Sequence, residues 1–472
     1  MLAVVLLCGL GLVMVYSASS VTAYSDYGDS SYYFDRQVVF MAAGALLCIV
    51  MAAVPYRLWL HPAVAAVVWL VAVGLLAYTA VAGVEALGAE RSIVIGAFTV
   101  QPSEFAKVAV LLVFASLYRS HHDGQLTIYQ FAGISIIGVA VPVFLIYQQP
   151  DLGTVIILFI GLVTVMVLGG MRWGFIAIVA GVCVLYVVFS CIAQPYHLTR
   201  IMTMLDPWLD PTGDGYQTIQ SLYALGSGGV TGVGLGLSRQ KYLYLPEAHT
   251  DFIFAIIGEE LGLAGTVLTL ALFAVFVWAG LRISRKAPDL AGCMVAGSLT
   301  ATIGFQAFVN MACVMGIAPV TGKALPFISY GGSSVVATFM MVGIILSVSM
   351  RSRVGVTYER RRDDLRVMGG GRSSGESRKS GESRKRSSGE GSTRSSGGSR
   401  TRSSGGSRKS GEGRTRSSGG SRKSGGVVEF PGGKKRSTSE SSQSRPRFSD
   451  GDLGSTGRIR YSSTRRKNPP DK

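Results

Sequence analysis

Ten apolar segments of membrane-spanning length recur along the first 350 residues, and they constrain the fold more than any other feature. A transmembrane helix needs roughly 20 mainly apolar residues. Charged residues make up only 15% of the 472-residue chain, whereas soluble proteins average about a quarter. We therefore predict an all-α, polytopic membrane protein with ten transmembrane helices. The predicted spans are 1–19, 37–55, 60–82, 103–118, 129–147, 152–170, 173–193, 261–281, 290–316 and 333–350.

A basic, low-complexity tail follows this membrane domain of residues 1–350. Residues 351–472 hold 32 Lys and Arg against 12 Asp and Glu, and the motif RSSGGSR occurs in them three times. Gly, Ser and basic residues cannot bury enough apolar surface to offset the cost of ordering the backbone. We therefore expect residues 351–472 to form a disordered, Gly/Ser/Arg-rich cytoplasmic tail. Because the net charge of +17 comes from this tail, it does not indicate a nucleic-acid partner.

Lys and Arg residues near the spans set the expected orientation, because they concentrate on the cytoplasmic side of a membrane. The basic tail places the C-terminus in the cytoplasm, and ten spans then place the N-terminus there as well. The longest segment between two spans, 194–251 between the seventh and the eighth, becomes a large extracytoplasmic loop. A loop of this length is usually functional or disordered.

One cluster of polar residues lies at the mouth of the fourth span and comprises Arg91, Gln101, Ser103, Glu104 and Lys107. Glu104 and Lys107 are three residues apart, so they share one helix face. Lipid does not tolerate such a face, which must point into the bundle or a water-filled cavity. The sequence leaves two roles open: a structural ion pair, or a cationic site for a phosphorylated lipid.

Asp251 stands where the 194–251 loop meets a span, and the apolar run FIFAII follows it. Partial desolvation raises the pKa of a carboxyl group toward values useful for proton transfer. Asp is also a favoured helix N-cap, and the residues alone favour that role. A further cluster, PVTGKALPFISYGGSS at 319–334, carries Lys323 among Pro and Gly residues that prevent a regular helix. Such backbone must be buried in protein or line a cavity.

Several of these motifs, in this order, resemble those of the SEDS (shape, elongation, division and sporulation) family of bacterial membrane proteins over about residues 1–350. LPEAHTDFIFA and the GGSS ending resemble the FtsW/SpoVE branch more than the RodA branch. The matching stretches are GAERSIVIGAFTVQPSEFAK, QQPDLGT, DPWLDPTGDGYQ, QSLYALGSGGVTGVGLG, LPEAHTDFIFAIIGEELG and PVTGKALPFISYGGSS.

The resemblance implies a peptidoglycan glycosyltransferase that polymerises lipid II into β-1,4-linked glycan at the outer face of the bacterial cytoplasmic membrane. It implies a role in septal wall synthesis at the division site, with a class B penicillin-binding protein and other division proteins as partners. The essential aspartate of the family matches Asp251. The resemblance therefore favours a catalytic base over a helix cap at this position.

The leaving pyrophosphate needs cationic groups around it. The expected substrate-binding residues are Arg91, Glu104, Lys107, Arg200, Arg239 and Lys323. The sequence predicts no certain cofactor, although a divalent cation (Mg or Mn) held partly by Asp251 is one expectation. Two other functions stay open, a lipid II flippase and a non-catalytic divisome scaffold. Many relatives carry Trp where Ser92 follows Arg91 here, which weakens the assignment of Arg91.

Overall fold

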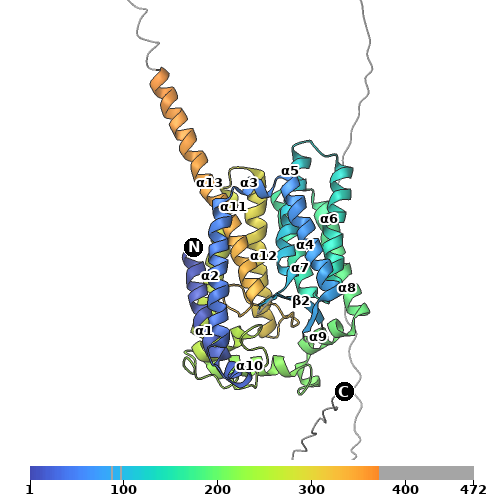
Figure 1. Ribbon diagram of the computed structural model, residues 1–472, viewed down its shortest axis with the longest axis vertical. Coiled ribbons are helices and arrows are strands. Elements are labelled where there is room, and N and C mark those ends of the chain that lie inside the picture. Colours follow the sequence, from blue (N-terminus) through green and yellow to red (C-terminus); the bar gives the residue numbers. More distant parts are fainter. Residues whose placement is uncertain (87–88, 96–97, 371–472) are drawn as a thin grey trace, which may run out of the picture. The chain divides into compact units, whose positions relative to one another are not determined.

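Long helices run side by side as a bundle in the computed structural model, which describes residues 1–86, 89–95 and 98–370 (Figure 1). A short 3₁₀ turn, η1, spans Pro207–Leu209. The α-helices are α1 Leu2–Tyr27, α2 Tyr32–Ala53, α3 Tyr56–Trp59, α4 Pro62–Ala82, α5 Pro102–His122, α6 Ile128–Gln148, α7 Leu152–Leu168, α8 Trp173–Ala193, α9 Pro195–Leu205, α10 Tyr216–Gly228, α11 Ile253–Arg285, α12 Leu290–Val314 and α13 Gly332–Gly370.

Each of the ten predicted spans coincides with a helix, and eight of these helices are long and apolar enough to cross a membrane. Helix α7 is a shorter apolar helix of 17 residues. Helix α5 carries Glu104 and Lys107 in its first turns. The chain is therefore a multi-pass membrane protein, and the count of ten spans stays a prediction.

The chain is mainly helical, as the sequence predicts, but three short strands between α4 and α5 also form an antiparallel sheet that was not predicted. Its strands are β1 Val84–Ala86, β2 Ala89–Ile95 and β3 Phe98–Val100. Strands β2 and β3 pair Ile93 with Val100 and Ile95 with Phe98. Branched and aromatic side chains favour strands, and these short runs join two long helices. The sheet was not predicted because hydropathy averaged over the length of a membrane span does not detect strands this short.

The loops and short elements are divided between the two ends of the bundle (Figure 1). Helices α9 and α10 and strand β2 lie at one end, which we call the loop end, and α3 lies at the other. The 194–251 segment is partly helical, since it contains α9, η1 and α10. At the opposite end α13 continues past residue 350 to Gly370. Most of the predicted tail, residues 371–472, lies outside the described residues.

Helix α11 begins eight residues before the predicted span and is kinked at Gly262 (φ 66°, ψ −159°). A Cβ atom at Gly262 would lie 2.3 Å from the backbone nitrogen of Gly232. Around the kink, Val233 and Gly234 donate backbone hydrogen bonds to the carbonyls of Glu259 and Glu260. Only glycine permits both this conformation and this close approach, so the loop after α10 is fixed against α11.

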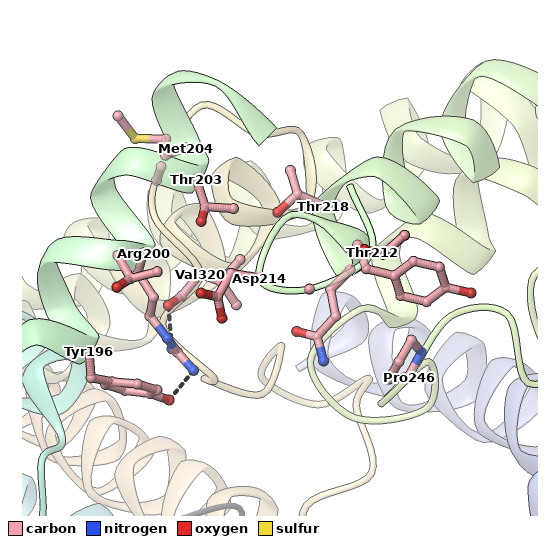
Figure 2. Close-up of a pocket in the computed structure, with 14 residues that line it drawn as sticks. Tyr196, Arg200, Thr203, Met204, Thr212, Asp214, Thr218, Pro246 and Val320 are labelled. Carbon is pink, nitrogen blue, oxygen red and sulfur yellow. Dashed lines mark hydrogen bonds between the residues drawn. The ribbon is translucent and has the colours of Figure 1, made fainter. Parts of the chain in front are cut away.

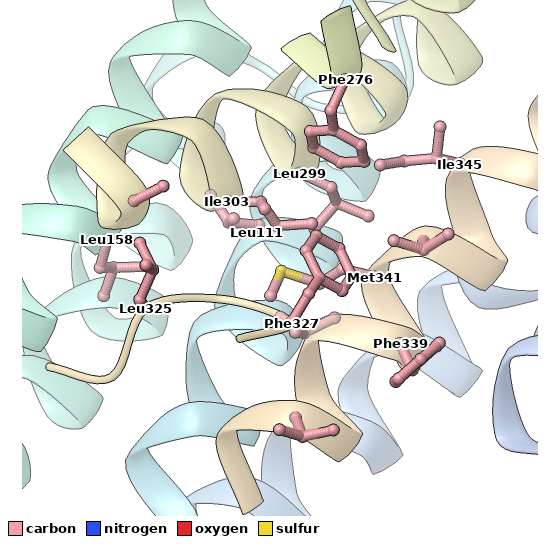
Figure 3. Close-up of a cluster of buried hydrophobic side chains, with 14 of the residues drawn as sticks. Leu111, Leu158, Phe276, Leu299, Ile303, Leu325, Phe327, Phe339, Met341 and Ile345 are labelled. Carbon is pink, nitrogen blue, oxygen red and sulfur yellow. The ribbon is translucent and has the colours of Figure 1, made fainter. Parts of the chain in front are cut away.

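The hydrophobic core joins α5, α7, α11, α12 and α13 with the irregular segment 315–331, which we call the re-entrant segment (Figure 3). Leu325 and Phe327 of this segment are buried, at 1% and 0% exposure. The Phe327 ring lies 5.7 Å from the ring of Phe276 and 6.0 Å from that of Phe339. These aromatic contacts hold non-helical backbone inside the bundle, where protein rather than lipid surrounds it.

We predict that Phe327→Ala destabilises the protein by about 3–5 kcal/mol, the usual cost of removing a buried aromatic ring. Thermal or denaturant unfolding of the detergent-solubilised protein measures the effect. The matched control is Phe308→Ala on α12, since Phe308 is 58% exposed. Equal stability of Phe327→Ala and the control would contradict an anchoring role for Phe327.

Candidate active site

Four charged side chains form a buried, charge-balanced cluster near the loop end. Lys107 Nζ lies 3.0 Å from Glu104 Oε2. Lys323 Nζ lies 2.7 Å from Asp151 Oδ2 and 3.6 Å from Glu104 Oε1. All four residues are at most 3% exposed. Two carboxylates face two ammonium groups, so the cluster is neutral and each charge has an opposite partner.

Neutral donors and acceptors complete this ion cluster. Lys107 also donates to Gln306 Oε1 at 2.8 Å, and Asp151 accepts from Ser103, Gln101 and Thr154. Asp151 is the N-cap of α7, where its carboxylate accepts from the Thr154 amide. Burying a charge is costly unless it is paired and hydrogen-bonded, and both conditions are met here.

The ion cluster ties the re-entrant segment to α5 and α7, because Lys323 belongs to that segment. The predicted substrate residues Glu104, Lys107 and Lys323 are brought together, but they are paired with one another and buried. This geometry favours the structural interpretation of the Glu104–Lys107 pair. Asp151 belongs to the cluster but was not among the predicted site residues. Its position directly before an apolar run, in the motif QQPDLGT, was the available signal.

Asp251 lies directly before α11 and beside the re-entrant segment. The N-cap of α11 is Phe252, without a side-chain cap bond, so the alternative role of Asp251 as helix cap is wrong. Asn310 Nδ2 donates to the carbonyl oxygens of both Asp251 (2.8 Å) and Lys323 (2.7 Å). A Cβ atom at Gly322 would lie 3.4 Å from Asp251 Oδ2. Asp251 is therefore partly buried and is positioned by the same segment that the ion cluster holds.

His249, two residues before Asp251, does not supply a cation to this region. Its ring packs against Tyr33 and Tyr330, with centroids 4.4 and 5.7 Å away. Its carbonyl oxygen accepts a hydrogen bond from the Tyr330 amide at 2.9 Å. Burial lowers the pKa of His249 below its ordinary value, so this side chain is neutral at pH 7.

Arg200 lines a cavity of about 340 Å³ at the loop end, which we call the Arg200 cavity (Figure 2). Its guanidinium donates to the Val320 carbonyl and the Tyr196 hydroxyl. It also lies over the Tyr196 ring, 4.4 Å from the centroid. Other residues that line the cavity are Thr199, Thr203, Met204, Thr212, Gly213, Asp214, Tyr216, Gln217, Thr218, Pro246 and Ala318.

The re-entrant segment links the Arg200 cavity to Asp251, because Val320 lines the cavity and Gly322 lies beside the Asp251 carboxylate. The two remaining predicted substrate residues are elsewhere. Arg239 is exposed on the loop after α10, and its amide donates to Glu259 Oε1 at 2.9 Å. Arg91 is in strand β2, and its side chain lies outside the part of the chain that the structure describes.

The deep carboxylates of Glu259 and Glu260 hold the loop that follows α10. Glu259 accepts from the Ser238 hydroxyl and the amides of Arg239 and Gln240. Glu260 accepts from the Ser17 hydroxyl at 2.7 Å and lies 3.4 Å from Lys241 Nζ. Both carboxylates are committed to hydrogen bonds within the protein, so their role is structural.

The profile of the FtsW/RodA/SpoVE family, described as "Cell cycle protein", matches residues 1–354. Stage V sporulation protein E of Bacillus subtilis is 40% identical over 74% of this chain and 95% of its own length. Probable peptidoglycan glycosyltransferase FtsW of Geobacter metallireducens is 39% identical over 75% of this chain and 94% of its own length.

Solved structures share the fold. One comes from work on "Structural coordination of polymerization and crosslinking by a peptidoglycan synthase complex". It matches 74% of this chain and 96% of its own chain, with a TM-score of 0.60 and 28% identity. The rod shape determining protein RodA of Thermus thermophilus matches 74% of this chain and 95% of its own, with a TM-score of 0.55 and 25% identity.

We predict that Lys107→Met destabilises the protein by about 3–5 kcal/mol, because it removes the nearer ammonium partner of the buried Glu104 carboxylate and leaves the cluster with a net negative charge. The double variant Glu104→Gln/Lys107→Met removes both charges and should recover a large part of this loss. Thermal unfolding of the purified proteins measures both effects. A double variant less stable than Lys107→Met would show that the ion pair is not the source of the loss.

Proposed function

This chain belongs to the FtsW/RodA/SpoVE family of cell-cycle proteins, as its motifs predicted, and we infer that it is a peptidoglycan glycosyltransferase that polymerises lipid II. Two relatives that are named as this enzyme are 39% and 40% identical to the chain, and the matches cover 94% and 89% of their own lengths. The structural observation that supports this function is the position of Asp251. It is a partly buried carboxylate at the loop end, beside a cavity that contains an arginine.

In the reaction we propose, a sugar hydroxyl of the acceptor attacks the anomeric carbon of the donor. The new C–O bond forms as the bond between that carbon and the diphosphate oxygen breaks, and the diphosphate leaves with the electron pair. The Asp251 carboxylate accepts the proton of the attacking hydroxyl. A general base of this kind typically contributes a factor of about 10²–10⁴ to the rate.

Arg200 is the residue we propose to stabilise the leaving diphosphate. Its guanidinium is already oriented by the Val320 carbonyl and the Tyr196 ring, so it loses little freedom when an anion binds. Arginine can bind phosphate oxygens through two parallel hydrogen bonds. The buried residues Glu104, Lys107 and Lys323 act as positioning residues, because they hold the segment beside Asp251. Arg239 is exposed on the loop after α10, so any contact that it makes with substrate would come from that loop.

A divalent cation stays a prediction from the sequence. Among the described residues no group of three or more His, Cys, Asp or Glu is arranged to hold a metal ion. A Mg²⁺ or Mn²⁺ ion would therefore come with the substrate diphosphate, and Asp251 is the carboxylate beside which it would bind. Such an ion would supply positive charge to the leaving group.

We further propose that both termini are cytoplasmic and that the enzyme acts at the division septum with a class B penicillin-binding protein. The basic residues of the predicted tail support this orientation. It puts the loop end, with Asp251 and Arg200, on the extracytoplasmic side. One solved relative comes from a complex that coordinates polymerisation and crosslinking, which supports a crosslinking partner.

Asp251→Asn is predicted to abolish glycan polymerisation while the protein stays folded, because an amide cannot accept the proton. The assay adds lipid II to the purified variant with its class B penicillin-binding protein and resolves the glycan products on a gel. The matched control is Asp123→Asn, the same chemical change at a half-exposed residue of the opposite end. The control should polymerise as the unaltered protein does.

The same experiment separates the alternatives. Equal polymer from Asp251→Asn and the unaltered protein would exclude Asp251 as the base. No polymer from any variant, with a working positive control, would favour a scaffold or a flippase. Transport of fluorescent lipid II across proteoliposomes would then identify the flippase.

A further inference from the structure

Helix α9, at the loop end, exposes a row of apolar side chains along one face (Figure 1). Leu198, Met202 and Leu205 are 46%, 51% and 70% exposed. They follow one another at intervals of four and three residues, the spacing of side chains that share one face of an α-helix. We call these three residues the α9 stripe. Neither the sequence motifs nor the proposed mechanism uses it.

The opposite face of α9 is turned toward the Arg200 cavity. Tyr196, Thr199, Arg200 and Thr203 line that cavity (Figure 2). An α-helix turns about 100° per residue, so the middle of these four positions lies about half a revolution from the middle of the α9 stripe. The Arg200 guanidinium donates to the Val320 carbonyl and so holds this face against the re-entrant segment. Helix α9 is therefore attached to the protein on one side and exposes an apolar surface on the other.

The position of α9 in the chain places it at the edge of the membrane. Helix α8 is long and apolar enough to cross a membrane, and only 11% of its most apolar stretch is buried inside the protein. Phe189 and Ile192, near its end, are exposed. Gln194 alone separates α8 from Pro195, where α9 begins, and its extended backbone makes the chain turn. Because one residue spans so short a distance, α9 lies where α8 leaves the hydrocarbon.

The composition of α9 is typical of a helix that lies in a membrane interface. Such helices have an apolar face buried at the boundary of headgroups and acyl chains and a polar face with basic residues. Residues 195–205 contain Arg200 and no Asp, Glu or Lys. Trp208, three residues after the helix, is 56% exposed, and Trp is enriched at membrane interfaces. Because the α9 stripe directly follows the lipid-facing end of α8, lipid is favoured over a protein partner as the group that covers it.

We propose that α9 is an interfacial helix whose stripe is embedded in the lipid leaflet at the loop end. The partner is the phospholipid itself, contacted at the boundary of its headgroups and acyl chains. Helix α9 then lies between lipid on one face and the Arg200 cavity on the other. The bilayer thereby keeps Arg200 turned toward the re-entrant segment. This role of α9 is independent of the reaction proposed above.

The test is photocrosslinking of the full chain in vesicles of radiolabelled phosphatidylcholine. The photoreactive residue p-benzoylphenylalanine replaces Leu198, Met202 or Leu205, one position at a time, and labelled protein is resolved on a gel. We expect a lipid adduct at all three positions, as at the positive control Ile192 of α8. The negative control is Pro211, an exposed residue of the same loop beyond η1, which should give none. Thermal unfolding of each variant checks that it is folded.

A second variant tests whether the helix is embedded as a unit. Met202→Glu places a carboxylate on the apolar face, and a charge is costly in lipid. In this background the probes at Leu198 and Leu205 should lose their lipid adducts, whereas Met202→Leu should keep them. Adducts that persist in folded Met202→Glu would overturn the proposal, because the contact would then be adventitious.

Two further results would also contradict an interfacial α9. One is the absence of a lipid adduct at the α9 stripe in vesicles where Ile192 gives one. The other is an adduct to a second copy of the chain, or to a co-reconstituted class B penicillin-binding protein, in place of the lipid adduct. A protein surface would then cover the stripe. Polymerisation of lipid II is not the readout in any arm, so a failure of the enzyme function leaves this test unaffected.

Discussion

The buried ion cluster of Glu104, Lys107, Asp151 and Lys323 is the interaction on which the site depends. The re-entrant segment has no regular secondary structure, and its backbone is held by hydrogen bonds from other elements, such as that from Asn310 to the Lys323 carbonyl. The Lys323 side chain adds a charged anchor, because its ammonium group is stable inside the bundle only beside the two carboxylates. The core contacts of Phe327, a few residues further along the chain, hold the same segment. The position of Asp251 follows from these two anchors.

Carboxylates at the loop end fall into two groups by their surroundings. Glu259 and Glu260 are each 1% exposed. Both accept hydrogen bonds from the protein, Glu259 from the Arg239 amide and Glu260 from the Ser17 hydroxyl. Asp151 is equally enclosed, as an N-cap and a partner of Lys323. Asp251, the residue proposed as the base, is partly exposed and lies next to Gly322. The deep carboxylates therefore have structural roles, whereas the proposed base lies at the edge of the bundle.

The helices could be predicted from the sequence because apolar length is a local property of the chain. The partners of the charged residues could not. Lys323 and Asp151 are 172 positions apart, and no local pattern shows that one binds the other. The role of Asp251 illustrates the same limit. Its neighbours favoured a helix cap, the family motif favoured a base, and only the structure shows that Phe252 occupies the cap position.

The depth of the charges along the bundle bears on the choice between a polymerase and a transporter. Transporters bind their cargo near the middle of the membrane, at breaks in the helices. Here Glu104 and Lys107 are in the first two turns of α5, and Asp151 caps the start of α7. Deeper layers are filled by apolar side chains such as Leu111, Leu299 and Met341 (Figure 3). A charged headgroup crossing the bundle would have to pass through this packed core. A reaction at the loop end requires no such passage, and the Arg200 cavity lies there.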